Sequence, residues 1–171
     1  RPAGGVGGRT RLAELYKEPR DEMAELITAE IGAPISFAKR AQVRIPLMMF
    51  SAFSGLAASY DWQESRPGLY GNDIRINKQP VGVVAAVVPW NMPQFLTVCK
   101  IAPALLAGCC VVLKPSPESV LDAQLLADFV EQAGLPPGVF NVVPGDRDVG
   151  EALVKHPGVD KVSFTGSTAA G

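Results

Sequence analysis

The sequence predicts a doubly wound α/β fold built on a mostly parallel sheet. Two observations point to this class. From Val81 onward, short apolar runs alternate with longer stretches of helical periodicity, which is the order expected for strands joined by crossover helices. These runs carry apolar residues at successive positions, so both faces of each strand should be buried, as in parallel sheets covered by helices.

The expected strands are the apolar runs at 83–88, 110–114, 139–143 and 159–164. Helices are expected between them, at 94–107, 119–133 and 147–155. Turn-forming or polar residues follow the strands in turn: Pro-Trp-Asn, Lys-Pro-Ser, Pro-Gly-Asp and Thr-Gly-Ser. In sheets of this kind the carboxyl ends of the strands share one edge, where ligands bind. The sequence therefore predicts a ligand site at that edge.

The chain before this region has a helical pattern. Apolar residues near the helical period predict a helix over 9–32 with a break at Pro19, and a second helix over 35–60 that is interrupted by Pro46.

A strand segment follows these helices. Apolar and polar residues alternate from Asp73 to Gln79, which predicts a strand with one exposed face. We therefore expect N-terminal helices over 1–64, a strand segment over 65–80 and the parallel-sheet domain over 81–171.

Composition narrows the classes of function. The 171 residues are 47% hydrophobic and 19% charged, with a formal net charge of -1, so neither nucleic acid nor an acidic membrane is an expected partner. Three cysteines, two of them adjacent, argue against a disulfide framework and favour the reducing cytoplasm. Since the first residue is Arg1, we expect the chain to begin partway through a longer protein.

Several residues at the predicted edge could bind a ligand, and each also has a purely structural interpretation. Asn91 could simply cap a turn, and Lys114 could be a solvated lysine at the end of a strand. Gly166 and Ser167 lie in "FTGSTAAG", where a strand meets the predicted start of a helix, a favourable place for a phosphate. The spacing is not that of a dinucleotide fingerprint or a P-loop, so an ordinary tight turn is an equal alternative.

The remaining candidates for chemistry are weaker. Cys99, Cys109 and Cys110 fall in a predicted helix and at a strand entry, where cysteines are more often small core residues than nucleophiles. His156 stands alone before a proline and is expected in a surface loop. No spacing of potential ligands indicates a metal site.

The motifs "PWNMP", "KIAPALLAGCCVVLKPSPES", "AGLPPGVFNVVPG" and "DKVSFTGSTAAG" together resemble the NAD(P)-dependent aldehyde dehydrogenase superfamily in order and spacing. The stretch "RDEMAELITAEIGAPISFA" is similar to the N-terminal helices of that family. The resemblance implies a Rossmann-like cofactor domain. It also implies that the side-chain amide of Asn91 donates to the oxyanion that forms when a cysteine attacks the aldehyde.

The resemblance also implies a cofactor site for NAD or NADP. Lys114 would contact the adenosine ribose hydroxyls, Gly166 and Ser167 would face the pyrophosphate, and Ala170 would lie under the adenine side. Many members that prefer NAD carry Glu three residues after the lysine, where this chain has Pro117, so we expect weak discrimination between NAD and NADP. The implied cofactor-binding set is Val88, Pro89, Trp90, Lys114, Ser116, Pro117, Gly145, Phe164, Thr165, Gly166, Ser167 and Ala170.

Two parts of the family's machinery are not matched within the chain. The nucleophilic cysteine and the general-base glutamate of the family lie beyond the position of Gly171, and no cysteine here matches the nucleophile's motif. We therefore expect residues 1–171 alone to be inactive. In the complete enzyme we expect a small-molecule aldehyde substrate and a homodimer or homotetramer joined through the strand segment. A CoA-acylating semialdehyde dehydrogenase and a non-catalytic nucleotide-binding or structural relative are the alternatives.

Overall fold

A computed structural model describes residues 11–12, 14–16 and 20–171 of the chain. Helix α2 (Arg20–Ile31) forms the second half of the helical region expected over 9–32. The predicted break at Pro19 lies outside the described residues. The helix carries Asp21 and Glu22 in its first turn, where carboxylates interact favourably with the helix dipole.

The second predicted helix continues through Pro46, so the expected interruption there was wrong. The chain passes from α3 (Ile35–Phe37) into the π-helical segment η1 (Ala38–Arg44) and then into α4 (Ile45–Ser59). Pro46 occupies the first turn of α4, where a missing backbone N–H is tolerated. The irregularity lies before the proline instead, in the wider turns of the π-helix.

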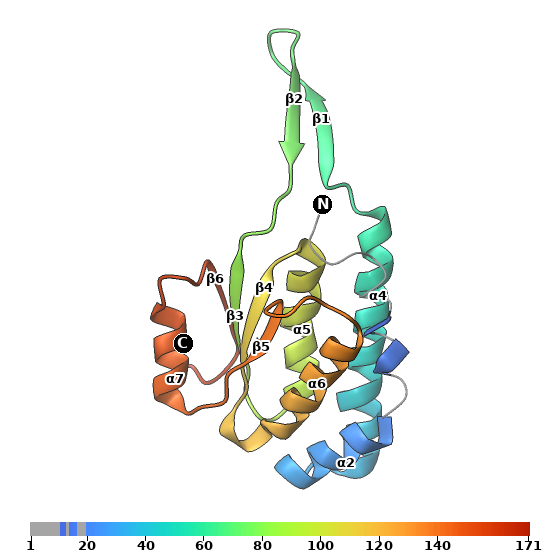
Figure 1. Ribbon diagram of the computed structural model, residues 1–171, viewed down its shortest axis with the longest axis vertical. Helices are drawn as coiled ribbons and strands as arrows, with labels where there is room; N and C mark the ends of the chain where they lie inside the picture. Colours follow the sequence, from blue (N-terminus) through green and yellow to red (C-terminus); the bar gives the residue numbers. More distant parts are fainter. Residues whose placement is uncertain (1–10, 13, 17–19) are drawn as a thin grey trace.

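A hairpin connects these helices to the sheet domain. Strand β1 (Gln63–Pro67) pairs antiparallel with β2 (Asp73–Asn77), and the two strands project away from the body of the molecule (Figure 1). The hairpin is the strand segment expected over 65–80, but its first strand begins at Gln63. Most of its residues are exposed, including Leu69 and Tyr70 at the tip, each with a relative exposure of 90%.

The sheet domain has the predicted parallel architecture. Its strands are β3 (Val83–Val87), β4 (Cys110–Lys114), β5 (Phe140–Val142) and β6 (Lys161–Phe164), and its helices are α5 (Pro93–Ala107), η2 (Pro117–Ser119), α6 (Leu121–Gln132) and α7 (Arg147–Lys155). The strand order is β5-β4-β3-β6, with all neighbours parallel. The chain thus moves outward from β3 to β5 and then crosses to the other side of β3, which makes a topological switch point between β3 and β6.

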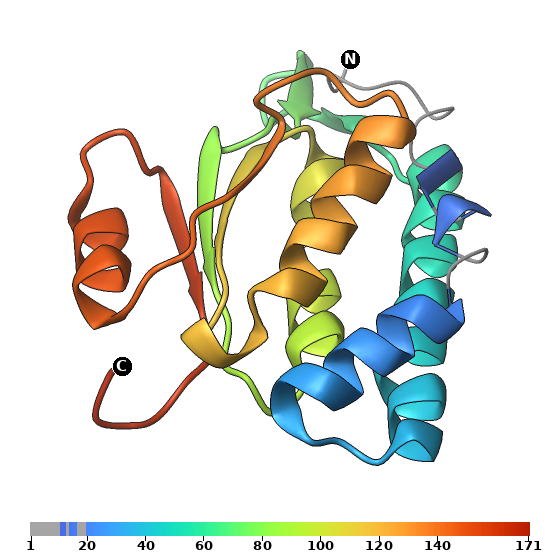
Figure 2. The same ribbon diagram turned by 60° about the horizontal axis from the view of Figure 1, so that its bottom comes forward.

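The elements form layers around this sheet (Figure 2). Helices α5 and α6 cover one face, with α4 and α2 packed beyond them, and α7 lies over the opposite face. The two central strands are largely buried, as predicted. Burial on both faces was wrong for β6. Val162 and Phe164 lie on the same face of this strand and each have a relative exposure of 39%, so the described residues cover that face only in part.

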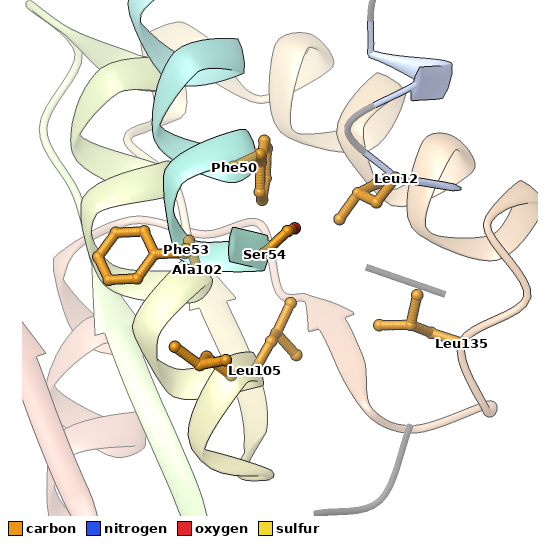
Figure 3. Close-up of a pocket in the computed structure, with 8 residues that line it drawn as sticks. Leu12, Phe50, Phe53, Ser54, Ala102, Leu105 and Leu135 are labelled. Atoms are coloured by element: carbon orange, nitrogen blue, oxygen red, sulfur yellow. The ribbon is translucent and has the colours of Figure 1, made fainter. Parts of the chain in front are cut away.

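A small apolar cavity remains between α4 and α5. Phe50, Phe53 and Ser54 line it from α4, and Leu105 from α5 (Figure 3). Its volume of about 20 Å³ is close to that of a single water probe. It is a packing gap in the core and is too small for an organic ligand.

Candidate functional site

The ends of three strands meet at one height on the rim of the sheet. Val87 is paired with Lys114 of β4 and also with Phe164 of β6. A cleft of about 680 Å³ opens at this point, on the side of the switch point where the general rule for such sheets places ligands. Its lining residues are Val87, Lys114, Ser116, Pro117, Glu118, Asp146, Arg147, Gly150, Glu151, Val154, Lys155, Phe164, Ser167, Ala169 and Ala170.

Lys114 is the buried cation of the cleft. Its relative exposure is 7%, and among the described residues its ammonium makes no hydrogen bond. Burial lowers the pKa of Lys114, while Asp146 and Glu118 oppose that shift by stabilising the charged form. A partly desolvated ammonium without a fixed partner favours interaction with a hydroxyl or an anion of a ligand.

Glu118 brings a carboxylate to the same cleft. The residue lies in η2, directly after the strand end, and it accepts a hydrogen bond from the hydroxyl of Ser116. That hydrogen bond lowers the pKa of Glu118, so the side chain is ionised at neutral pH. The cleft therefore carries hydrogen-bond acceptors next to the ammonium of Lys114.

The turn after β6 lines one side of the cleft. Thr165 extends the strand by donating its backbone N–H to Val87 at 3.0 Å, and the chain then turns at Gly166. A Cβ at Gly166 would lie 2.5 Å from Cζ of Phe164, so this position requires glycine for the ring to lie across the turn. The Phe164 ring thus forms an apolar wall next to Ser167.

Helix α7 supplies a wall that sequence reasoning missed. Its N-cap is Asp146, whose side chain accepts from the backbone N–H of Arg147. The lining residues of α7 are spaced three or four apart, from Arg147 and Gly150 to Val154, which is the spacing of one helical face. That periodicity was visible in the sequence. What the sequence did not show is that this face lies over the rim.

Asn91 lies in a loop between β3 and α5. The residue is exposed, and among the described residues its side-chain amide makes no hydrogen bond. Its main-chain oxygen accepts a 3.2 Å hydrogen bond from Nε2 of Gln42. Helix α5 begins two residues later at Pro93, so the free amide is close to the positive end of a helix dipole.

A buried polar chain anchors the start of α5. Tyr16 donates its hydroxyl hydrogen to Oε1 of Gln94 at 2.9 Å, and Nε2 of Gln94 donates to the main-chain oxygen and to Oδ1 of Asp122, both at 2.9 Å. Glu30 in turn accepts from the backbone N–H groups of Leu121 and Asp122. The N-terminal helices are thereby connected to the first turns of both α5 and α6.

The structure brings together about half of the residues predicted for cofactor binding. The cleft contains Lys114, Ser116, Pro117, Phe164, Ser167 and Ala170. The other predicted residues do not line it: Val88, Pro89, Trp90, Gly145, Thr165 and Gly166. Val88 is buried and donates its N–H to the Lys114 carbonyl at 3.2 Å, whereas Trp90 has a relative exposure of 50%.

The three cysteines are partly or fully buried. Cys109 is buried, and burial raises the pKa of the partly buried Cys99, although Lys100 opposes that shift. The side chain of His156 is exposed, and its Nδ1 accepts from the backbone of Gly158. In the described part of the chain, no group of three or more His, Cys, Asp or Glu side chains could hold a metal ion, and no helix is long and apolar enough to cross a membrane.

The sequence profile of the aldehyde dehydrogenase family matches residues 10–171. The chain belongs to this family. Geranial dehydrogenase of Castellaniella defragrans is 45% identical to this aldehyde dehydrogenase chain over 161 residues, a match that covers 94% of the chain and 34% of the relative. The chain thus spans about a third of the length of the curated relatives that it matches.

Solved aldehyde dehydrogenases share the fold of the chain. A mutant of aldehyde dehydrogenase C from Pseudomonas syringae, complexed with NAD+ and octanal, superposes with a TM-score of 0.91 at 42% identity, covering 96% of this chain and 33% of that one. The Mycobacterium tuberculosis aldehyde dehydrogenase complexed with NAD+ superposes with a TM-score of 0.92 at 41% identity, covering 96% of this chain and 34% of that one.

Proposed function

We propose that this chain is the N-terminal, cofactor-binding part of an enzyme that converts an aldehyde, NAD(P)+ and water into a carboxylic acid, NAD(P)H and a proton. The observation that carries the proposal is the family match over residues 10–171. Support comes from Asn91 and Lys114, which both stand at the carboxyl edge of the sheet with free polar groups. A purely structural relative has no need of such an unpaired donor.

The cleft at the rim fits a nicotinamide dinucleotide. Its volume of about 680 Å³ lies within the usual range for small-molecule sites. Lys114 offers a cation for ribose hydroxyls or phosphate, and Glu118 offers acceptors for hydroxyls. The turn at Gly166 and Ser167 would face the pyrophosphate, and Phe164 would supply an apolar wall. When bound, the cofactor accepts a hydride from the substrate.

Asn91 is the catalytic residue that we assign within the chain. Negative charge develops on the aldehyde oxygen when a thiolate attacks the carbonyl carbon. A fixed neutral N–H donor stabilises this charge in the transition state more than the carbonyl of the substrate. Pro89 and Pro93 restrict the backbone on both sides of Asn91, and the N-terminus of α5 adds a favourable field.

We assign the nucleophile to the part of the enzyme outside residues 1–171. Cys109 is buried, and burial disfavours the thiolate of Cys99. The isolated chain should therefore show no aldehyde oxidation. We also propose that the projecting hairpin β1–β2 joins subunits of a homodimer or homotetramer, because both outer edges of the hairpin are open to strand pairing. The unpaired cysteines suit a cytoplasmic enzyme.

The test of this function is NADH formation from a panel of aldehydes by the enzyme that contains the chain. Replacing Asn91 with Ala should lower kcat by about 10²-fold to 10³-fold, with little change in KM for the cofactor. The matched control is Asn141→Ala, which removes a side-chain amide that donates to the carbonyls of Val111 and Gly138. Normal turnover with weak cofactor binding in Asn91→Ala would contradict the assigned role.

A further inference from the structure

Gln42 is a polar side chain that the packing of the core does not explain. It lies in η1 with no exposed surface, and Nε2 reaches the loop before α5, 3.2 Å from the Asn91 carbonyl oxygen and 3.3 Å from the Met92 sulfur. Its own Oε1 is buried without a hydrogen-bond partner. An apolar side chain of similar size would avoid the cost of this unpaired oxygen.

The contact with Asn91 accounts for this amide. We propose that Gln42 is a positioning residue, which holds the main chain of Asn91 and thereby fixes where the Asn91 side-chain amide points. The proposal rests on the oxyanion role assigned to Asn91 under the proposed function. Gln42 does not reach the substrate itself, and its effect on the reaction passes through the loop.

The loop needs such an anchor because little else holds it at Asn91. Val88 is tied to the Lys114 carbonyl on one side, and Gln94 is tied to Tyr16 and Asp122 on the other. Between them, and within the described residues, the Gln42 amide supplies the hydrogen bond that Asn91 makes. Asn91 is exposed, and Pro89 and Pro93 restrict only their own backbone and that of the residue before each, so without this bond the main chain at Asn91 itself could shift.

The π-helical geometry of η1 gives a reason why Gln42 can reach this loop. A π-helix bonds residue i to residue i+5, which widens the turn and changes the direction of the side chains relative to an α-helix. The segment covers Ala38–Arg44, with Gln42 near its centre, and it packs against α5. The local irregularity therefore lies where the helix contacts the proposed catalytic loop.

A double-mutant cycle in the complete enzyme separates this role from a structural one. Gln42→Met keeps the length of the side chain but removes the N–H donor. In the otherwise unmodified enzyme it should lower kcat by roughly 10-fold and leave KM for NAD+ within about 2-fold, because an oxyanion donor displaced by a fraction of an ångström is less effective. In the Asn91→Ala background the same substitution should change kcat by less than about 2-fold.

The outcomes are distinguishable. An equal loss of kcat in both backgrounds, or no loss in either, overturns the positioning role while the proposed function stands. If Asn91→Ala alone keeps normal kcat, the oxyanion role fails and the inference about Gln42 fails with it. If Gln42→Met does not fold, Gln42→Asn takes its place, because the shorter side chain brings the amide out of reach of Asn91. The loss of kcat is then measured for Gln42→Asn in the same two backgrounds. Asn141→Ala is the control for a lost amide elsewhere, with kcat unchanged.

Discussion

The side chains of Gln94 and Asp122 are joined by a 2.9 Å hydrogen bond that connects α5 to the first turn of α6. The second carboxylate oxygen of Asp122, Oδ2, is buried without a partner. Burial raises the pKa of Asp122 to about 7, although the Gln94 hydrogen bond opposes the shift and the nearby Glu30 carboxylate adds to it. This junction therefore holds a carboxyl group that the folded protein prefers to keep protonated.

Replacing Asp122 with Asn should stabilise the protein at neutral and higher pH. Because the folded-state pKa is raised, the unfolded chain releases this proton at lower pH than the folded chain does. The contribution of Asp122 to the free energy of unfolding therefore falls as pH rises from about 4 to about 7, and it stays lower above that range. The variant lacks this loss, so its advantage should grow across the same window, to on the order of a few kcal/mol at pH 8.

Urea unfolding at several pH values measures this effect as the difference between wild type and variant. Asp128→Asn is the matched control, because Asp128 lies on the same helix but is exposed. It should show no such pH dependence. An Asp122→Asn variant whose stability follows wild type in parallel from pH 4 to pH 8 would show that Asp122 is already ionised in the folded state.

Replacing Lys114 with Met should weaken cofactor binding more than it slows turnover. The substitution keeps the apolar stem, which passes 3.8 Å from the position of a Cβ on Gly150, but removes the ammonium. Loss of a charged hydrogen bond made equally in ground and transition states should raise KM for NAD+ by about 10-fold or more with kcat nearly constant. Lys161→Met is the control, since the exposed Lys161 lies at the start of β6 and does not line the cleft.

Gly166→Ala should also impair cofactor binding, for a steric reason. The added Cβ would lie 2.5 Å from Cζ of Phe164, so the ring must move away from the turn. We expect a rise of at least about 10-fold in the dissociation constant of NAD+, measured by fluorescence titration. Gly55→Ala is the control, because no atom lies within 4 Å of a Cβ at that helical position. It should leave NAD+ binding unchanged and raise stability by up to about 1 kcal/mol.

The choice between NAD and NADP should depend on the acidic residue after Lys114. Pro117, the third residue after Lys114, carries no charge. Glu118 also lines the cleft, and its carboxylate accepts a hydrogen bond from the hydroxyl of Ser116. We predict that NADP is accepted beside NAD. The ratio of kcat/KM for NAD to kcat/KM for NADP should lie below about 10³. Glu118→Gln should lower that ratio further, and Pro117→Glu should raise it, because a carboxylate repels the 2′-phosphate.

Glu151→Gln is the control for this series. It removes a carboxylate from the same cleft but frees the ammonium of Lys155, so it has the same effect on net charge as Glu118→Gln and shows how much of the change in the ratio comes from the charge of the cleft and how much from the position of Glu118. A ratio far above 10³-fold in the unmodified enzyme, roughly 4 kcal/mol, would show that another feature excludes the phosphate. An unchanged ratio in Glu118→Gln would show that this carboxylate does not face the ribose.

Local patterns in the sequence were sufficient to predict the sheet domain. Runs such as 83–88 and 110–114 are apolar on both faces, which is typical of parallel strands covered by helices. Because the carboxyl ends of parallel strands share an edge, the convergence of Lys114 and Phe164 could also be predicted from the sequence. The hairpin was predicted only in part. Gln63–Pro67 has no alternation of apolar and polar residues, and its strand conformation comes from pairing with β2.

Only the tertiary structure decided which residues complete the candidate site. Gln42 reaches Asn91 from 49 positions away, and the contact depends on a π-helical segment that no local pattern indicates. The α7 face around Gly150 becomes a wall of the cleft because the chain crosses β3 after β5. Local periodicity reflects the burial of each segment, so it predicts strands, helices and buried faces. Contacts between distant segments depend on how those elements pack, and side-chain direction at those contacts is settled only there.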